Sequence, residues 1–122
     1  MPSRLYGAAA EFIEAKYHGA FHEVCDVVSV GTSFTQIIKP DPERIILLAV
    51  NLSVNTVYVG FDNQVSASRG IILSPNGGSY QVDIETDTML PTRPLFGLST
   101  GASSNVYTLF VRRDHKFPTE VT

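Results

Sequence analysis

The chain of 122 residues has little of what enzyme and metal centres are usually built from. It has no Trp and a single cysteine, Cys25, so an intramolecular disulfide is excluded. It contains no P-loop, no G-x-S-x-G, no H-E-x-x-H and no C-x-x-C motif. We therefore expect no enzymatic activity, no cofactor and no metal ion.

Charge and long apolar runs are also scarce. Nine Lys and Arg against twelve Asp and Glu give a net charge of -3 without any block of like charge, which argues against binding to phosphate backbones. The longest apolar run is Ile45–Val50, far short of the ~20 residues of a membrane helix. The N-terminus lacks the basic start and apolar run of a secretory signal. We expect synthesis and folding in a reducing cytoplasm, with neither nucleic acid nor membrane as a partner.

What the chain does have is a regular series of short segments rich in Val, Ile, Tyr, Phe and Thr, separated by Pro, Gly, Ser, Asn and Asp. This spacing is typical of an all-β domain. The predicted strands are Cys25–Val30, Phe34–Lys39, Arg44–Asn51, Thr56–Phe61, Gly70–Leu73, Tyr80–Glu85, Leu95–Ser99 and Val106–Arg113. No amphipathic helix separates them, so parallel βαβ units are not expected.

Two patterns refine this prediction to an antiparallel β-sandwich or jelly roll of about eight short strands. The loops KPDPER at 39–44 and SPNGGS at 74–79 combine Pro with residues that turn easily. Val57, Val59 and Phe61 fall on one face of a strand and Tyr58 and Gly60 on the other, which indicates one buried sheet face. IILLAV at 45–50 does not alternate and predicts a central strand covered on both faces. We divide the chain into an N-terminal arm at 1–24, a β-sandwich domain at 25–113 and a C-terminal tail at 114–122.

The first two dozen residues differ from the rest. Apolar residues recur there at helical spacing, Ser3 is a possible N-cap, and one or two helical turns are expected before Gly19. The apolar and aromatic residues of this arm are candidates for contact with a partner: Leu5, Phe12, Ile13, Tyr17 and Phe21. The alternative is that the arm lies as a strap over the sheets of its own domain.

A cluster at 18–26 contains residues that ligate metals. His18 and His22 are four residues apart and are followed by Glu23, Cys25 and Asp26. Gly19 lies between the two histidines, and no second ligand-rich segment completes a tetrahedral set. We therefore interpret the histidines as solvated or interface residues and Cys25 as a small buried hydrophobic residue.

Two further clusters of charge have simple explanations. Asp83, Glu85 and Asp87 alternate along a predicted strand and are interpreted as its solvated, edge-protecting face rather than a catalytic or calcium site. The basic group at 112–116 is too small for a nucleic-acid site. Phe117, which follows it, is a second candidate for contact with a partner.

Two segments resemble a module of tailed bacteriophages. They are RIILLAVNLSVNTVYVGFDNQVSASRGIILSPNGGSYQVD at 44–83 and PLFGLSTGASSNVYTLFVRR, which ends at Arg113. Both are similar in pattern to small phage virion proteins with a β-sandwich or jelly-roll fold, namely capsid decoration (cement) proteins, head fibres and tail components. The resemblance covers roughly half the chain and does not include the arm.

The resemblance implies a structural, non-enzymatic protein of the virion. Its expected partners are the major capsid protein or other virion proteins and copies of itself, as a homotrimer on the capsid surface. Copies that bind only the assembled shell would stabilise it by mass action. The alternatives are a tail, neck or fibre-anchor component and a receptor- or glycan-binding module, for which the loops offer mostly Ser, Gly, Asn and Thr.

Overall fold

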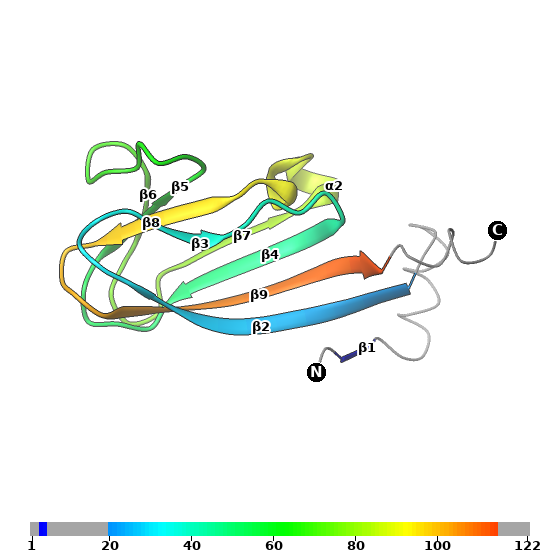
Figure 1. Ribbon diagram of the computed structural model, residues 1–122, viewed down its shortest axis with the longest axis horizontal. Coiled ribbons are helices and arrows are strands. Elements are labelled where there is room, and N and C mark those ends of the chain that lie inside the picture. Colours follow the sequence, from blue (N-terminus) through cyan, green and yellow to red (C-terminus); the bar gives the residue numbers. More distant parts are fainter. Residues whose placement is uncertain (1–2, 5–19, 115–122) are drawn as a thin grey trace.

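The computed structural model describes residues 3–4 and 20–114, and nearly every element in it is a strand (Figure 1). The strands are β1 (Ser3–Arg4), β2 (Ala20–Val30), β3 (Thr35–Ile38), β4 (Arg44–Asn51), β5 (Val57–Gly60), β6 (Ile71–Leu73), β7 (Ser79–Asp83), β8 (Leu95–Ser99) and β9 (Ser104–Asp114). A short helix, α2 (Ile84–Asp87), and a 3-10 turn, η1 (Leu90–Thr92), connect β7 to β8. No helix in the described ranges is long and apolar enough to cross a membrane.

The strands form two antiparallel sheets packed face to face. The five-stranded sheet has the order β1-β2-β9-β4-β7, and the four-stranded sheet has the order β3-β8-β5-β6. The chain passes between the sheets at nearly every connection, so strands adjacent in sequence mostly lie in different sheets. This is the strand arrangement of a jelly roll. The predicted all-β sandwich is confirmed.

The observed strands follow the predicted ones closely. β4 and β8 have the predicted bounds, and the others differ by a few residues at their ends. The largest difference is at β2, which begins at Ala20 rather than Cys25 because residues 20–24 continue the pairing with β9. The sheet therefore includes the last residues of what the sequence predicted to be the arm.

The acidic trio was predicted wrongly. Asp83 ends β7, and the residues after it turn into α2 instead of continuing the strand. The Asp83 side chain accepts a hydrogen bond from the Thr86 N–H at 2.8 Å, and the Asp87 carboxylate accepts one from the Asp83 N–H at 3.0 Å. These carboxylates cap a helix, as Asp does at an N-cap.

Apart from residues 20–24, which belong to β2, the described part of the N-terminal arm is β1. Ser3 and Arg4 pair with Glu23 and His22, so they extend the five-stranded sheet at its β2 edge. The helical turns predicted for the arm lie outside the described residues. The domain itself begins and ends at one corner, since Ala20 is paired with Asp114.

The core lies between the sheets and is built from one side of each strand. Leu47 and Ala49 of β4 are fully buried against residues of the opposite sheet such as Val57, Val59 and Leu95. The full buried cluster is Val30, Ile37, Ile38, Leu47, Ala49, Val57, Val59, Leu73, Val82, Leu95 and Val106. The predicted inward orientation of Val57 and Val59 is confirmed.

Arg44 joins the two sheets from the start of β4. It is 1% exposed, and its guanidinium donates to the carbonyl oxygens of Pro91 at 2.6 Å, Lys39 at 3.1 Å and Arg93 at 2.8 Å. The same group lies 5.1 Å above the ring of Phe110. Because buried carbonyls need hydrogen-bond donors, this one side chain supplies donors to carbonyls of two connections, β3–β4 and β7–β8.

Asn51 has a similar role at the other end of β4. Its side chain is fully buried and donates to the carbonyl oxygens of Asn55 at 2.7 Å and Leu73 at 3.0 Å. Its own oxygen accepts hydrogen bonds from the N–H and the hydroxyl of Ser53. The N-x-S sequence at 51–53 is therefore a structural motif whose buried Asn51 ties the end of β4 to the β4–β5 loop and to β6.

Replacing Arg44 by Met should lower the free energy of unfolding by about 3 kcal/mol, because one buried and two part-buried carbonyls lose their donor. Urea denaturation at pH 7 measures this change. The matched control is Arg69→Met, which removes a surface ion pair with Asp62 (side chains 61% and 52% exposed) and should cost under about 0.5 kcal/mol. Equal losses in the two variants would contradict the assigned role of Arg44.

Candidate functional site

Of the residues predicted to contact a partner, the structure describes one, Phe21. Phe21 is 0% exposed and belongs to β2, so its prediction as an exposed arm contact is wrong for the chain described here. Leu5, Phe12, Ile13, Tyr17 and Phe117 lie outside the described residues, so their roles stay predictions. Other candidates lie on the surface of the described domain.

The described members of the histidine-containing cluster do not converge on one point, and His18 lies outside the described residues. His22, Glu23, Cys25 and Asp26 are successive or near neighbours on β2, where alternate side chains point to opposite sides of the sheet. Within residues 3–4 and 20–114, no three His, Cys, Asp or Glu form a group that could hold a metal ion. Cys25 is exposed, so its prediction as a buried hydrophobic residue is wrong.

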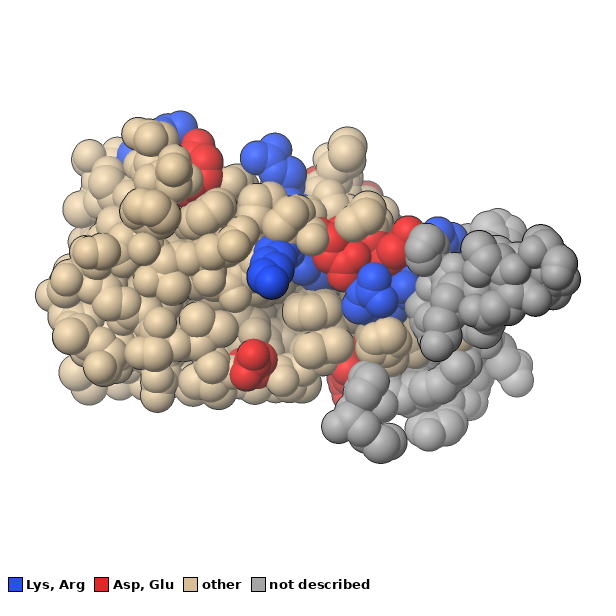
Figure 2. Space-filling view, viewed as in Figure 1, with Lys and Arg blue, Asp and Glu red and all other residues tan. Residues whose placement is uncertain are grey.

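The basic group near the C-terminus is partly neutralised. Arg112 bonds the Asp41 carboxylate through two nitrogens, at 2.7 and 3.3 Å, and Arg113 bonds Glu43 at 2.7 Å. Figure 2 shows acidic and basic side chains side by side near the end where β2 begins and β9 ends, whereas much of the rest of that face is uncharged. His115 and Lys116 lie outside the described residues.

The outer face of the five-stranded sheet carries a continuous set of apolar side chains. On β4, Leu47 and Ala49 point into the core, and their neighbours Ile46, Leu48 and Val50 point outward and are half-buried. On β9, Val106 and Thr108 are buried, and the alternate residues Tyr107, Leu109 and Val111 point outward and are likewise apolar. We call this set the outer apolar face: Val27, Ile46, Leu48, Val50, Tyr107, Leu109 and Val111.

The strand register places these residues in rows across the sheet. Val27 is opposite Tyr107, which is opposite Val50. The next row contains Cys25, Leu109 and Leu48, followed by a row with Val111 and Ile46. The pKa of the Tyr107 phenol is raised, first by its hydrogen bond with Cys25 and then by burial, so this side chain is neutral at pH 7. On the β7 side the rows end in the polar residues Ser79, Gln81 and Asp83, and on the β2 side they end in Val27, Cys25 and Glu23.

The outer face of the four-stranded sheet is also apolar but smaller. Tyr58 of β5 is opposite Ile72 of β6 and Leu98 of β8. Nearby, the rings of Phe34 and Phe96 are in edge-to-face contact with centroids 6.2 Å apart, and Phe34 is 52% exposed. Both sheets therefore present apolar residues to the outside as well as to the core.

The signal for these faces was present in the sequence. IILLAV in β4 and VYTLFV in β9 lack the polar alternation of a strand with one solvated face. The sequence predicted that β4 is covered on both faces, whereas in the structure only its inward side faces the other sheet. Contiguous apolar surface that is partly exposed in a folded domain is a candidate site of interaction.

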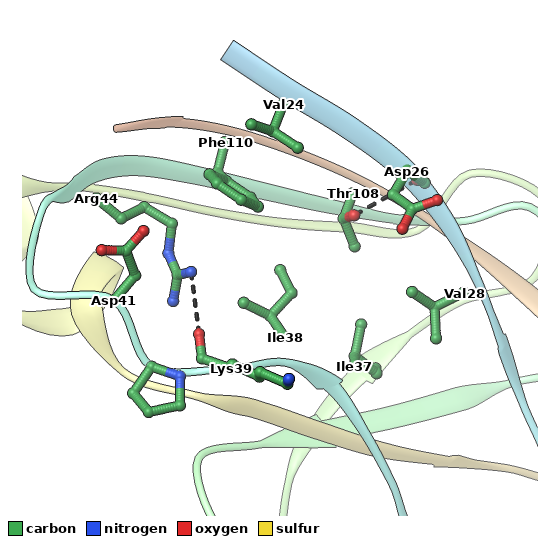
Figure 3. A pocket seen from close by; sticks show the side chains of 11 residues that line it. Val24, Asp26, Val28, Ile37, Ile38, Lys39, Asp41, Arg44, Thr108 and Phe110 are labelled. Atoms are coloured by element: carbon green, nitrogen blue, oxygen red, sulfur yellow. Dashed lines mark hydrogen bonds between the residues drawn. The ribbon is translucent and has the colours of Figure 1, made fainter. Parts of the chain in front are cut away.

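A groove of about 330 Å³ opens between the sheets at the β2–β3 side (Figure 3). Its walls include Val24 and Val28 of β2, Ile37 and Ile38 of β3, and Phe110 of β9. Asp26 and Lys39 are exposed on its border, and Arg44 and Asp41 lie at one end, where Arg44 donates to the Lys39 carbonyl (Figure 3). The walls are mainly aliphatic, with no constellation of paired acid, base and nucleophile among the lining residues.

Asp41 is held in its charged form at the end of this groove. Burial by itself raises the pKa of the Asp41 carboxyl, but the hydrogen bonds from Arg112 and from the Glu43 N–H, with the charges of Arg112 and Arg44, outweigh it and leave the pKa below its usual value. Burial lowers the pKa of the Arg44 guanidinium, against the effect of the Asp41 charge. The cluster has a structural function, because Arg44 donates to backbone carbonyls and Arg112 bonds the Asp41 carboxylate.

No protein-family model matches the chain. No curated protein matches it either. Among solved structures, a protein from the disulfide-linked pili of Bacillus endospore appendages has a TM-score of 0.48 at 16% identity, with 76% of this chain and 85% of that chain covered. A cupin domain of Schizosaccharomyces pombe has a TM-score of 0.46 at 10% identity, with 98% of this chain and 69% of that chain covered. A helix-turn-helix family transcriptional regulator of Vibrio cholerae has a TM-score of 0.43 at 14% identity, with 89% of this chain and 48% of that chain covered.

Replacing Asp41 by Asn should lower the free energy of unfolding by about 1 kcal/mol at pH 7, because a charged pair with Arg112 is lost. The folded-state pKa is below the unfolded value of about 3.9, so this stabilisation exists above that pH and is lost as the pH falls through the folded-state pKa. Urea denaturation of both proteins at pH 7 and pH 3 should show the difference shrinking. A difference that is unchanged at pH 3 would refute the assignment.

Proposed function

We propose that this chain is a non-enzymatic structural protein of a tailed-bacteriophage virion, a decoration (cement) protein that binds the assembled capsid shell. Its β-sandwich supplies the binding surface, and the outer apolar face of the five-stranded sheet lies against the shell. Its partners are the major capsid protein and other copies of the chain. Its location is the capsid surface.

The observation that carries this proposal is the outer apolar face itself. In an antiparallel sheet with one solvated side, outward positions are polar. Here the register aligns Leu48 of β4 with Leu109 of β9, and Ile46 with Val111, in the middle of the sheet's outer side. Such a surface loses contact with water only when another molecule covers it, and each ~100 Å² of apolar area covered contributes about 2.5 kcal/mol to association before the costs of binding.

The surroundings of this face suit a docking role. Polar side chains border the apolar centre on its β7 side, at Gln81 and Asp83, and at Glu23 of β2. This distribution is the usual anatomy of a protein–protein interface. The rigid strands β4 and β9 supply the centre, so little conformational entropy is lost on binding.

The place of the interaction in a virion rests on the sequence resemblance. The segment at 44–83 that resembles phage structural proteins forms β4 to β7, and the segment ending at Arg113 forms β8 and β9. Copies that bind the assembled shell, and not its free subunits, would stabilise the shell by mass action. No reaction is part of this function.

The test is sedimentation of the purified protein with phage capsids that lack it, followed by heating. The expected result is stoichiometric co-sedimentation and a higher temperature of capsid disruption. Binding to tails alone would replace the capsid role by a tail, neck or fibre-anchor role. Binding to neither particle would refute the virion proposal and leave the receptor- or glycan-binding alternative, for which a glycan screen is the measurement.

The docking face is tested by the double variant Leu48→Lys, Leu109→Glu. These residues are directly opposite each other, so the new charges can pair across the strands and preserve the sheet while making the face polar. Binding to capsids should weaken at least tenfold, or about 1.4 kcal/mol. The control Ser68→Lys, at an exposed loop position, should bind normally. Retained binding by a folded double variant, judged by circular dichroism, would exclude this face as the docking site.

A further inference from the structure

The two sheets have four edges, and three of them are short or irregular. β6 has three residues and β7 has five, and β7 runs directly into α2. β3 has four residues, and its pairing shifts in register between Gln36 and Ile38. Short and bulged edge strands are the ordinary means by which proteins prevent unwanted pairing of strands.

The edge of β2 is different. β1 covers it only at His22 and Glu23, and β2 then continues to Val30 with no described strand on that side. This stretch, residues 24–30, contains no Pro and no Lys, and Cys25, Asp26, Val27 and Ser29 are exposed along it. Val27 is 49% exposed, which is unusual for a β-branched residue in the middle of a long strand. We call this stretch the open edge of β2.

The open edge has backbone groups available for pairing. The Val27 N–H donates to the carboxylate of the preceding Asp26 at 2.8 Å. It therefore points away from β9 and toward the free side of β2. The Asp26 side chain occupies the position that a carbonyl oxygen of an incoming strand would take.

We propose that the open edge of β2 pairs antiparallel with the same edge of a second copy of the chain, about a twofold axis at Val27. The limits of the edge define this register. β1 occupies Glu23 at one end, and the chain leaves the strand for the turn at Gly31 at the other, so Val27 is the midpoint of residues 24–30.

A second copy fits because the segment V-C-D-V-V-S-V is nearly the same read from either end. Val24 lies opposite Val30 of the second copy, Cys25 opposite Ser29, and Val27 opposite Val27. A twofold contact between two copies requires such self-complementarity, whereas pairing with a strand of an unrelated protein does not require it. Only the Asp26–Val28 pair is mismatched, and Asp26 turns away from the Val27 N–H when the strands join.

The contact also continues the outer apolar face. Val27 ends the row formed with Tyr107 and Val50, and its side chain points to the same side of the sheet. Pairing at Val27 joins two such rows end to end across the axis. The two five-stranded sheets become one, and their outer apolar faces form one surface of twice the width.

This inference does not depend on the proposed function, because the pair forms in solution without any virion component. It sets the contact between copies as twofold, in place of the trimer expected from the resemblance. The Asp26 carboxylate must be displaced, so the pair should be reversible. A trimer in solution would overturn it.

Sedimentation equilibrium of the whole chain is the first test. The average mass should rise from 13.3 kDa toward twice that value as concentration increases. Val27→Lys puts two like charges opposite each other on the axis and should keep the protein monomeric. The control Val54→Lys changes a side chain that is 76% exposed in the β4–β5 loop and should associate like the unchanged chain. A chain monomeric at all concentrations, or dimers of Val27→Lys, would refute the proposal.

Cross-linking tests the register. Ser29→Cys adds a thiol opposite Cys25 of the second copy, and a disulfide within one chain is excluded because the two positions are about 13 Å apart along β2. Mild oxidation should give a covalent dimer. Ile72→Cys, a control on β6 at a residue 61% exposed, should give at least tenfold less dimer. Equal yields from the two variants would refute the register at Val27, even if the chain proves to be dimeric.

Discussion

The packing of β4 is the constraint on which most of this structure depends. Its inward residues, Leu47 and Ala49, are fully buried against the opposite sheet, and its outward residues are apolar as well. Both ends of the strand are anchored by buried polar side chains, Arg44 at the start and Asn51 at the end, which bond to the carbonyls of neighbouring connections. One strand thus supports the core, positions the loops and supplies the centre of the proposed docking face.

The sequence predicted the fold well because local signals agree with the tertiary structure. Turn residues separate β-rich segments at regular intervals, and β4 and β8 were predicted with their observed bounds. The errors have physical causes. Glu85 was placed in a strand because alternation cannot distinguish a polar strand from a capped helical turn, and Cys25 was expected inside because the sequence does not show that it lies on the outward side of β2, opposite Leu109.

The candidate site was less predictable than the fold. The missing alternation in β4 showed that both of its sides are apolar, but the rows across β2, β9 and β4 depend on strand order and register. The buried contacts of Arg44 join residues 47 and 49 positions away in sequence, which no local pattern reveals. β2 has an open edge because β1 pairs with it at only two residues, His22 and Glu23.

The central claim is that the outer apolar face of the five-stranded sheet lies against the shell. Hydroxyl-radical footprinting of the protein, free and bound to capsids, tests it directly, because Tyr and Leu side chains react only where solvent reaches them. Tyr107, Leu109 and Leu48 should lose reactivity on the capsid, while Tyr58 and Phe96 on the other sheet keep theirs. Protection of Tyr58 and Phe96 with unchanged reactivity of Tyr107 and Leu109 would contradict it.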